Sequence, residues 1–199
     1  MRIIAGEWRG RRLNAPRGSD VRPTTDRVRE SWFSILGSRI QGASVLDLFC
    51  GSGALGLEAL SRGAAEAVFV DRSRKALQAL ERNIRELGAE YRARVVSGDA
   101  LGFVKGLSPA AFDLALVDPP YDRGFAPRVV EAWCTVPFAR ELWVEHRSSE
   151  DLPECGEVDR RRYGDTMLSG HLAPIEIQSD PPQLVFIPGH FALAHPEGL

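Results

Sequence analysis

Residues 45–56 read VLDLFCGSGALG and contain the pattern that decides the fold. Residues 45–49 are a compact run of strand-favouring residues, and they lead directly into a glycine loop of the form G-x-G-x-x-G. The residues after the loop, 54–62, predict a short helix that ends at Gly63. A strand, a glycine loop and a helix in this order are typical of a nucleotide-binding unit in an α/β protein.

Acidic residues at the predicted strand ends indicate what kind of ligand this loop would take. Asp71 lies 20 residues after Gly51, at the end of the predicted strand 67–70, and can accept hydrogen bonds from ribose hydroxyls. Asp47, four residues before Gly51, would repel a pyrophosphate, which favours the cationic S-adenosylmethionine over a dinucleotide. Asp99 can accept from an adenine amino group or cap a helix. A tight turn without a ligand is the alternative interpretation.

The alternation of strands and helices continues along the chain. We expect a helix at 74–87, strands at 94–96, 113–117 and 142–145, an antiparallel pair at 161–163 and 167–172, a first helix that ends at Gly37, and a strand and turn within 2–10. This order predicts a mostly parallel sheet with helices on both faces. The expected division is a basic N-terminal extension at 1–43, a catalytic domain at 44–173 and a proline-rich tail at 174–199, in which 184–187 is a possible edge strand.

The composition is that of one ordinary globular domain of 199 residues. No apolar run approaches the roughly 20 residues of a membrane span, and the first residues lack the apolar stretch of a secretory signal. The three cysteines, Cys50, Cys134 and Cys155, are scattered, which argues against a disulfide framework or a zinc site and favours a reducing cytoplasm.

The distribution of charge is uneven. The formal net charge of −2, taken alone, argues against a nucleic-acid partner. Residues 1–43, however, carry nine arginines and four acids for a net +5, whereas the rest of the chain carries −7. Arginine outnumbers lysine 23 to two, and guanidinium groups suit phosphate contacts and stacking on bases. A GC-rich genome would explain the ratio of arginine to lysine, but it would not explain why the net positive charge is concentrated in residues 1–43.

Asp118-Pro119-Pro120-Tyr121 follows the predicted strand 113–117 and therefore lies beside the same strand ends. Two consecutive prolines stiffen the turn and remove two backbone donors, so the Asp118 carboxylate and the Pro119 carbonyl remain as acceptors. A planar amino group offers two N–H donors that fit both, and Tyr121 offers a face for stacking a base. The turn therefore predicts transfer of a methyl group to a base amino nitrogen, whose delocalised lone pair must be oriented.

Several stretches together closely resemble the bacterial RsmD family. They are 2–6 (RIIAG), 22–30 (RPTTDRVRE), 46–64 (LDLFCGSGALGLEALSRGA), 118–121 (DPPY) and 163–166 (YGDT). Members of this family are S-adenosylmethionine-dependent methyltransferases that modify the exocyclic N2 of a guanine in 16S rRNA. The resemblance covers residues 1–173 and implies a Rossmann-like, mostly parallel seven-stranded sheet with an N-terminal β-hairpin extension.

The resemblance also implies roles for individual residues. The candidate cofactor-binding residues are Asp47, Phe49, Gly51, Ser52, Gly53, Asp71, Arg72, Asp99 and Ala100. The candidate catalytic residues, which would hold the target amino group, are Asp118, Pro119, Pro120 and Tyr121. The candidate RNA-binding residues are Arg9, Arg11, Arg12, Arg22, Thr24 and Arg27, with residues 160–162 as a second contact. Cys50 stands where the family commonly has alanine, and Asp71 replaces the more usual glutamate.

Three other functions compete with this hypothesis. A DNA adenine-N6 or cytosine-N4 methyltransferase shares the Asp-Pro-Pro-Tyr chemistry, but the chain has no room for a large target-recognition insertion. An NAD-dependent oxidoreductase leaves that motif unexplained, and so does a non-enzymatic RNA-binding factor. We therefore expect a cytoplasmic, monomeric enzyme that acts on 16S rRNA or the small ribosomal subunit, with no metal and no membrane partner.

Overall fold

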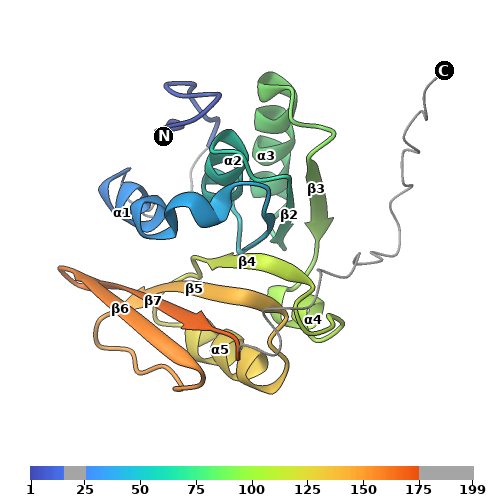
Figure 1. The fold of residues 1–199 in the computed structure, drawn as a ribbon. Helices are drawn as coiled ribbons and strands as arrows, with labels where there is room; N and C mark the ends of the chain where they lie inside the picture. Colours follow the sequence, from blue (N-terminus) through green and yellow to red (C-terminus); the bar gives the residue numbers. More distant parts are fainter. Residues whose placement is uncertain (16–25, 175–199) are drawn as a thin grey trace.

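The computed structural model describes residues 1–15 and 26–174, and within them seven strands form one sheet in the order β3-β2-β1-β4-β5-β7-β6 (Figure 1). The elements are α1 (Asp26–Leu36), η1 (Gly37–Ile40), β1 (Ser44–Leu48), α2 (Ala54–Ser61), β2 (Glu66–Asp71), α3 (Arg74–Leu87), β3 (Ala93–Ser97), α4 (Ala100–Val104), β4 (Phe112–Val117), α5 (Phe125–Thr135), β5 (Ala139–Arg147), β6 (Glu157–Tyr163) and β7 (Thr166–Leu172). The predicted alternation of strands and helices is confirmed.

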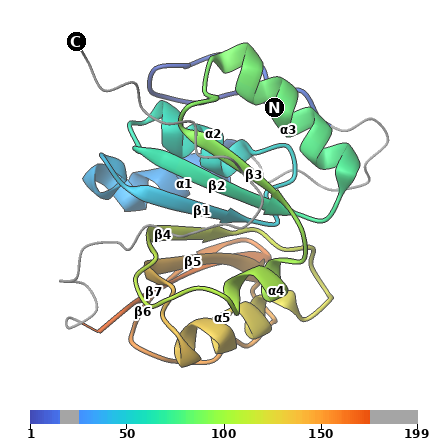
Figure 2. The ribbon, with the colours of Figure 1, turned by 90° about the vertical axis from the view of Figure 1, so that its right-hand side faces the viewer.

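Strands β1 to β5 are parallel, whereas β7 runs antiparallel to β5 and to β6. Helices α1, α2 and α3 cover one face of the sheet, and α4 and α5 cover the other (Figure 2). Both faces of the central strands are therefore buried, and every residue of β1 is buried. A parallel sheet covered on both faces needs such continuous apolar strands, which is why their positions could be predicted from the sequence.

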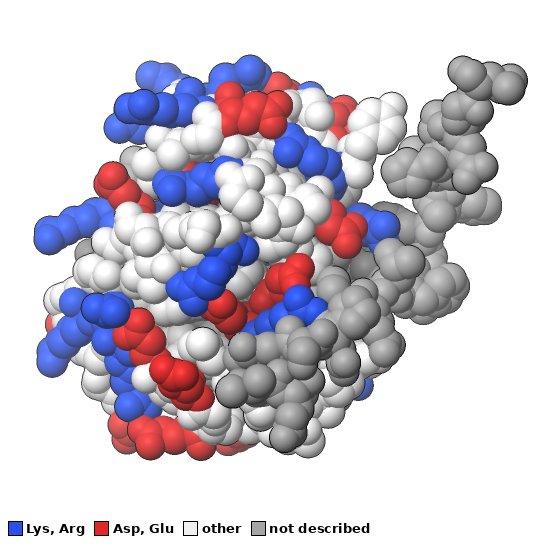
Figure 3. Space-filling model, in the orientation of Figure 1, with Lys and Arg blue, Asp and Glu red and all other residues white. Residues whose placement is uncertain are grey.

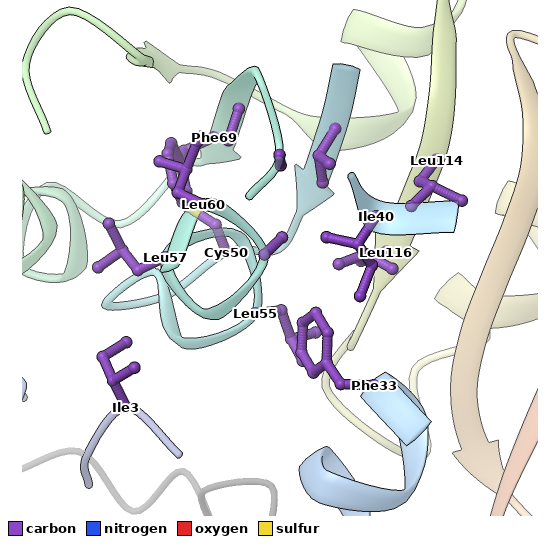
Figure 4. Close-up of a cluster of buried hydrophobic side chains, with 14 of the residues drawn as sticks. Ile3, Phe33, Ile40, Cys50, Leu55, Leu57, Leu60, Phe69, Leu114 and Leu116 are labelled. Carbon is purple, nitrogen blue, oxygen red and sulfur yellow. The ribbon is translucent and has the colours of Figure 1, made fainter. Parts of the chain in front are cut away.

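The core on the α1–α3 side is built around helix α2. Leu55, Leu57 and Leu60 of α2 are at most 4% exposed and belong to the same buried cluster as Phe33 of α1 and Leu116 of β4 (Figure 4). A second buried cluster lies beneath α4 and α5 on the other face of the sheet. The two clusters fix the positions of the strand ends from both sides.

The N-terminal hairpin consists of a single antiparallel bridge between Arg2 and Arg12, and it is held on α2 by buried polar groups. The side chain of Glu58, which is fully buried, accepts from the backbone N–H groups of Ile4 at 2.7 Å and Ala5 at 3.0 Å. A carboxylate that accepts several N–H bonds is well satisfied without water. The basic N-terminal segment is thus part of the same packed body as the sheet.

Two features of the fold differ from the sequence-based expectations. Cys134, in α5, and Cys155, before β6, form a disulfide with their Cα atoms 5.8 Å apart, so the expectation of no disulfide is wrong. Their separation of 21 residues gave no signal, because only the packing of α5 beside the β5–β6 connection brings them together. Helices α4 and α5 were also not predicted individually, and the possible strand 184–187 lies outside the described residues.

The other cysteine, Cys50, is free and buried. In the part of the chain that the structure describes, no helix has both the length and the apolar character required to cross a bilayer.

Gly6 tests how tightly the N-terminal hairpin docks on α2. Its φ is +85°, and a Cβ at this position would lie 1.9 Å from the backbone oxygen of Ser61. We expect Gly6→Ala to lower the free energy of unfolding by about 3 kcal/mol or more, because the hairpin must move away from the helix. Denaturant unfolding monitored by circular dichroism measures this.

Gly10→Ala is the matched control, since its φ is +83° but nothing lies within 4 Å of its Cβ position. It should cost only the conformational strain of about 1–2 kcal/mol. Equal losses in the two variants would contradict close docking at Gly6.

Candidate active site at the carboxyl ends of the strands

Three carboxylates meet where the order of the strands reverses. Strand β1 has β2 on one side and β4 on the other, because the chain runs outward from β1 through β2 to β3 and then crosses back to β4. Asp47 lies in β1, Asp71 ends β2 and Asp118 follows β4. In open α/β sheets, ligands bind outside the carboxyl ends of the strands at such a switch point. The fold therefore gathers the sequence-predicted acids at the position expected for a ligand.

The loop after β1 is shaped by the acid at the end of β2. Gly51 N–H donates to Asp71 Oδ2 at 2.9 Å, and Ser73 N–H donates to Asp71 Oδ1 at 2.8 Å. Phe49 and Gly51 both have positive φ, 58° and 54° respectively, so the loop turns sharply before α2 begins. Each oxygen of Asp71 thus holds one backbone donor and retains a further lone pair for a hydroxyl donor.

The glycines of the loop have different physical roles. A Cβ at Gly53 would lie 2.4 Å from Leu80 Cδ1, and one at Gly56 would lie 2.3 Å from the ring of Phe69. These two glycines allow α2 to pack closely on its neighbours. Nothing lies within 4 Å of the corresponding position at Gly51, so its backbone faces open space where a ligand could approach.

Asp47 is a buried carboxylate that lacks a cationic partner among its hydrogen bonds. It is 1% exposed and accepts from Gly56 N–H at 2.8 Å. Burial, with a smaller contribution from repulsion by Asp118 and Asp71, raises the pKa of Asp47 to about 8, against the lowering effect of the Gly56 bond. A positively charged ligand would relieve both effects. These three acidic side chains therefore fit the sulfonium and ammonium groups of S-adenosylmethionine and do not fit a pyrophosphate.

The remaining candidate cofactor-binding residues lie along the same edge. The ring of Phe49 packs on that of Phe125 with centroids 5.1 Å apart, and the Arg72 guanidinium lies 6.0 Å from the Phe125 centroid. Asp99 Oδ2 accepts from Gly102 N–H at 2.7 Å, so this acid caps α4, as one of its two interpretations predicts. The first residue of α4, Ala100, is buried, as is Ser52 in the loop after β1.

Asn83 of α3 connects this loop to the N-terminal segment. Its buried side-chain amide donates to Ser52 O and to Asn14 O, both at 3.0 Å. Its Oδ1 accepts from the Asn14 backbone N–H at 2.7 Å and from the Asn14 side chain at 3.0 Å. One amide thus fixes both the glycine loop and the end of the hairpin. Sequence reasoning missed it, because a lone asparagine on a helix carries no signal of a tertiary contact.

The Asp118–Tyr121 turn is anchored through its tyrosine. Tyr121 OH donates to Glu145 Oε1 of β5 at 2.6 Å and lies 3.2 Å from Thr166 Oγ1 of β7. Partial burial and the Glu145 contact raise the pKa of the Tyr121 phenol, which keeps it protonated as a donor. The Arg147 guanidinium lies 5.0 Å from the ring centroid, so a base can stack only on the opposite face. Sequence reasoning also missed Glu145, which it treated only as the end of a strand.

The candidate RNA-binding residues are only partly described. Arg9, Arg12 and Arg27 are exposed, and Arg11 is exposed while it donates to Glu86 O of α3 at 2.6 Å. Arg22 and Thr24 lie outside the described residues. Residues 160–162 are in β6 with exposed side chains. Within residues 1–15 and 26–174, no group of three or more His, Cys, Asp or Glu side chains is arranged to hold a metal ion.

Comparisons with known proteins agree with this geometry. The family model described as "Conserved hypothetical protein 95" matches residues 1–170. "Ribosomal RNA small subunit methyltransferase D" of Escherichia coli K12 is 46% identical over 132 residues, and the match spans 65% of each chain, slightly less than two thirds of that relative. The Haemophilus influenzae protein of the same name is 37% identical over 67% of this chain and 70% of its own.

Solved structures give the same result for the fold. A structure titled "Putative methyltransferase yhhF from Escherichia coli" has a TM-score of 0.76 and 36% identity, and it covers 87% of this chain and 99% of its own. The Rossmann-like methyltransferase fold is therefore confirmed.

Asp47 should make stability depend on pH in a characteristic way. The folded protein holds this proton up to about pH 8, whereas the unfolded chain releases it near the ordinary value of 3.8. The contribution of the retained Asp47 proton to the free energy of unfolding is therefore complete below pH 3.8, and it is lost as the pH rises to about 8. Between pH 6 and pH 9, the wild type should lose about 2–3 kcal/mol more unfolding free energy than Asp47→Asn. Asp99→Asn is the control that should follow the wild type, and parallel curves for all three would contradict the shift.

Asn83→Ala should destabilise the protein by about 2–4 kcal/mol, because it removes four hydrogen bonds and leaves buried backbone groups unpaired. Asn14→Ala should cost no more than about 1 kcal/mol, since the backbone N–H and oxygen of residue 14 keep their bonds to Asn83. Urea unfolding compares the two variants. Similar losses would show that the Asn83 amide does not fix the loop.

Proposed function

Since the chain belongs to the family that the conserved hypothetical protein 95 model describes, the RsmD family, we propose that it transfers a methyl group from S-adenosylmethionine to the exocyclic N2 of a guanine in 16S rRNA. The observation that carries the proposal is the meeting of buried Asp47 with the Asp118–Tyr121 turn at one switch point of the sheet. The first suits a cationic methyl donor, and the second suits a planar amino group.

The cofactor would be held by groups from three strand ends. Asp47 would face its positive charges, Asp71 its ribose hydroxyls and Asp99 its adenine amino group. When bound, S-adenosylmethionine supplies a methyl group on a positively charged sulfur. The backbone at Gly51 would approach it most closely, because that glycine faces open space.

The Asp118–Tyr121 turn would orient the nucleophile. The Asp118 carboxylate and the Pro119 carbonyl accept the two N–H bonds of the target amine, which directs the nitrogen lone pair toward the methyl group. Tyr121, held by Glu145 and Thr166, offers one ring face to the guanine. The amine proton leaves to Asp118 or to water after transfer. A guanine in a stack must be flipped out to reach this turn.

The substrate would be 16S rRNA, alone or in the small ribosomal subunit. The names of the relatives in two bacteria support an rRNA substrate, and the exposed arginines of the N-terminal hairpin supply phosphate contacts. A DNA amino-methyltransferase is the second candidate, because the Asp118–Tyr121 chemistry also suits adenine and cytosine.

Methyl transfer to purified small-subunit RNA and to DNA separates these candidates. With labelled S-adenosylmethionine, we expect incorporation into the RNA only, at a guanine N2 that nuclease digestion and mass spectrometry identify. Asp118→Ala should lower the rate by about 100-fold or more through loss of amine orientation, with cofactor affinity largely kept. Asp151→Ala changes an exposed acid outside the turn and should leave the rate unchanged. A wild-type rate in Asp118→Ala would overturn the proposed role of this residue.

A further inference from the structure

A groove of about 640 Å³ runs between helix α1 and the edge strand β6, and the proposed function leaves it without a role. Its α1 side is formed by one stripe of the helix, and its β6 side by alternate residues of the strand. The lining residues used below are Arg27, Glu30, Ser31, Asp159, Arg161 and Tyr163. Both elements lie on the same side of the molecule in Figure 1, where Figure 3 shows basic and acidic side chains interleaved.

The groove leads to the candidate active site. Tyr163, at its β6 end, pairs with Thr166 at the start of β7. Thr166 Oγ1 in turn lies 3.2 Å from Tyr121 OH in the catalytic turn. A nucleic-acid strand that lay in the groove would therefore pass beside the position proposed for the target base.

Three arginines line the groove, and one of them, Arg39, is held in an ion pair with Glu141 at 2.8 Å, whereas the other two are less engaged. Arg161 forms an exposed ion pair with Asp159 at 3.0 Å, and such pairs contribute little to stability. Arg27 is exposed in the first turn of α1, where a positive charge opposes the helix dipole, and it forms no ion pair with any residue that the structure describes. The fold itself thus gains little from either guanidinium, and both are positioned to contact phosphates.

The acids and hydroxyls of the groove can form hydrogen bonds with ribose hydroxyls and backbone oxygens. Glu30 and Asp159 would repel phosphates, but their carboxylates can accept hydrogen bonds from ribose 2′-hydroxyls, which DNA lacks. Ser31 can donate to phosphate or ribose oxygens, and the ring of Tyr163 can stack on an unpaired base. The combination fits a sugar–phosphate backbone with hydroxyls better than it fits DNA or a uniformly acidic peptide.

We propose that the groove between α1 and β6 binds the single-stranded RNA backbone that flanks the methylated nucleotide. Arg27 and Arg161 contact phosphates, and Glu30 and Asp159 accept from 2′-hydroxyls. This inference deepens the proposed function and rests on it for the identity of the natural strand. The groove supplies a second contact surface besides the N-terminal hairpin.

Binding of fluorescein-labelled oligouridylate, followed by fluorescence anisotropy, tests the groove without methyl transfer. We expect Arg27→Ala and Arg161→Ala each to weaken binding about fivefold to tenfold and to reduce the slope of log K against log salt by about 0.7. Arg27→Lys should restore part of the loss. Glu30→Gln should reduce the preference for oligouridylate over oligodeoxyuridylate, which differs from it only in the 2′-hydroxyls.

Arg85→Ala is the matched control, because it removes an exposed arginine from α3, near the opposite end of the sheet. Thermal unfolding and cofactor affinity should be unchanged in every groove variant. If Arg27→Ala and Arg161→Ala both bound RNA with wild-type affinity, the proposal that the groove binds RNA would be wrong. The proposed methyltransferase function would be unaffected. Loss of RNA affinity in these variants, together with a wild type that methylates no RNA, would support the groove and overturn the proposed function.

Discussion

The hydrogen bond from the Gly56 amide to the buried Asp47 carboxylate is the contact on which the rest of the site depends. It ties the first turn of α2 to β1, and the absence of a side chain at Gly56 lets the helix lie against Phe69 of β2. The loop between β1 and α2 then turns within reach of Asp71. A carboxylate held in this way keeps its position but is costly to ionise, so the protein is prepared for a cation before one arrives.

The sequence was sufficient to predict the sheet because its central strands are covered on both faces and therefore appear as continuous apolar runs. Helix α3 could be predicted for a different reason: it buries one face only, so Leu77, Leu80, Ile84 and Leu87 recur at helical spacing. Helix α4 spans only Ala100–Val104, too short for a period to be recognised. The pairing of Cys134 with Cys155 was invisible, because it depends on where α5 lies in three dimensions.

The residues of the candidate site also differ in whether the sequence could identify them. Residues in local motifs, such as Gly51 and Asp118, could be identified because the motif itself places them after a strand. The side chains that hold those motifs in position could not, since Asn83 and Glu145 act across long stretches of chain and belong to no pattern. The structure adds a packing role for Gly53 and Gly56 that the sequence could not show, because a Cβ at either position would clash with a neighbouring side chain. The repulsion of Asp47 by Asp71 and Asp118 could not be predicted from the sequence, because it depends on where the three side chains lie in the folded protein.

The docked hairpin has a consequence for how the chain can be divided. A shortened protein that began at β1 would leave the buried Glu58 carboxylate with only Arg62 as a partner, because Ile4 and Ala5 would be gone. Asn83 would lose three of its four hydrogen bonds and keep only Ser52. Such a fragment would expose apolar surface and unsatisfied polar groups together. The first residues thus act as a cover that the remainder of the domain needs in order to stay folded.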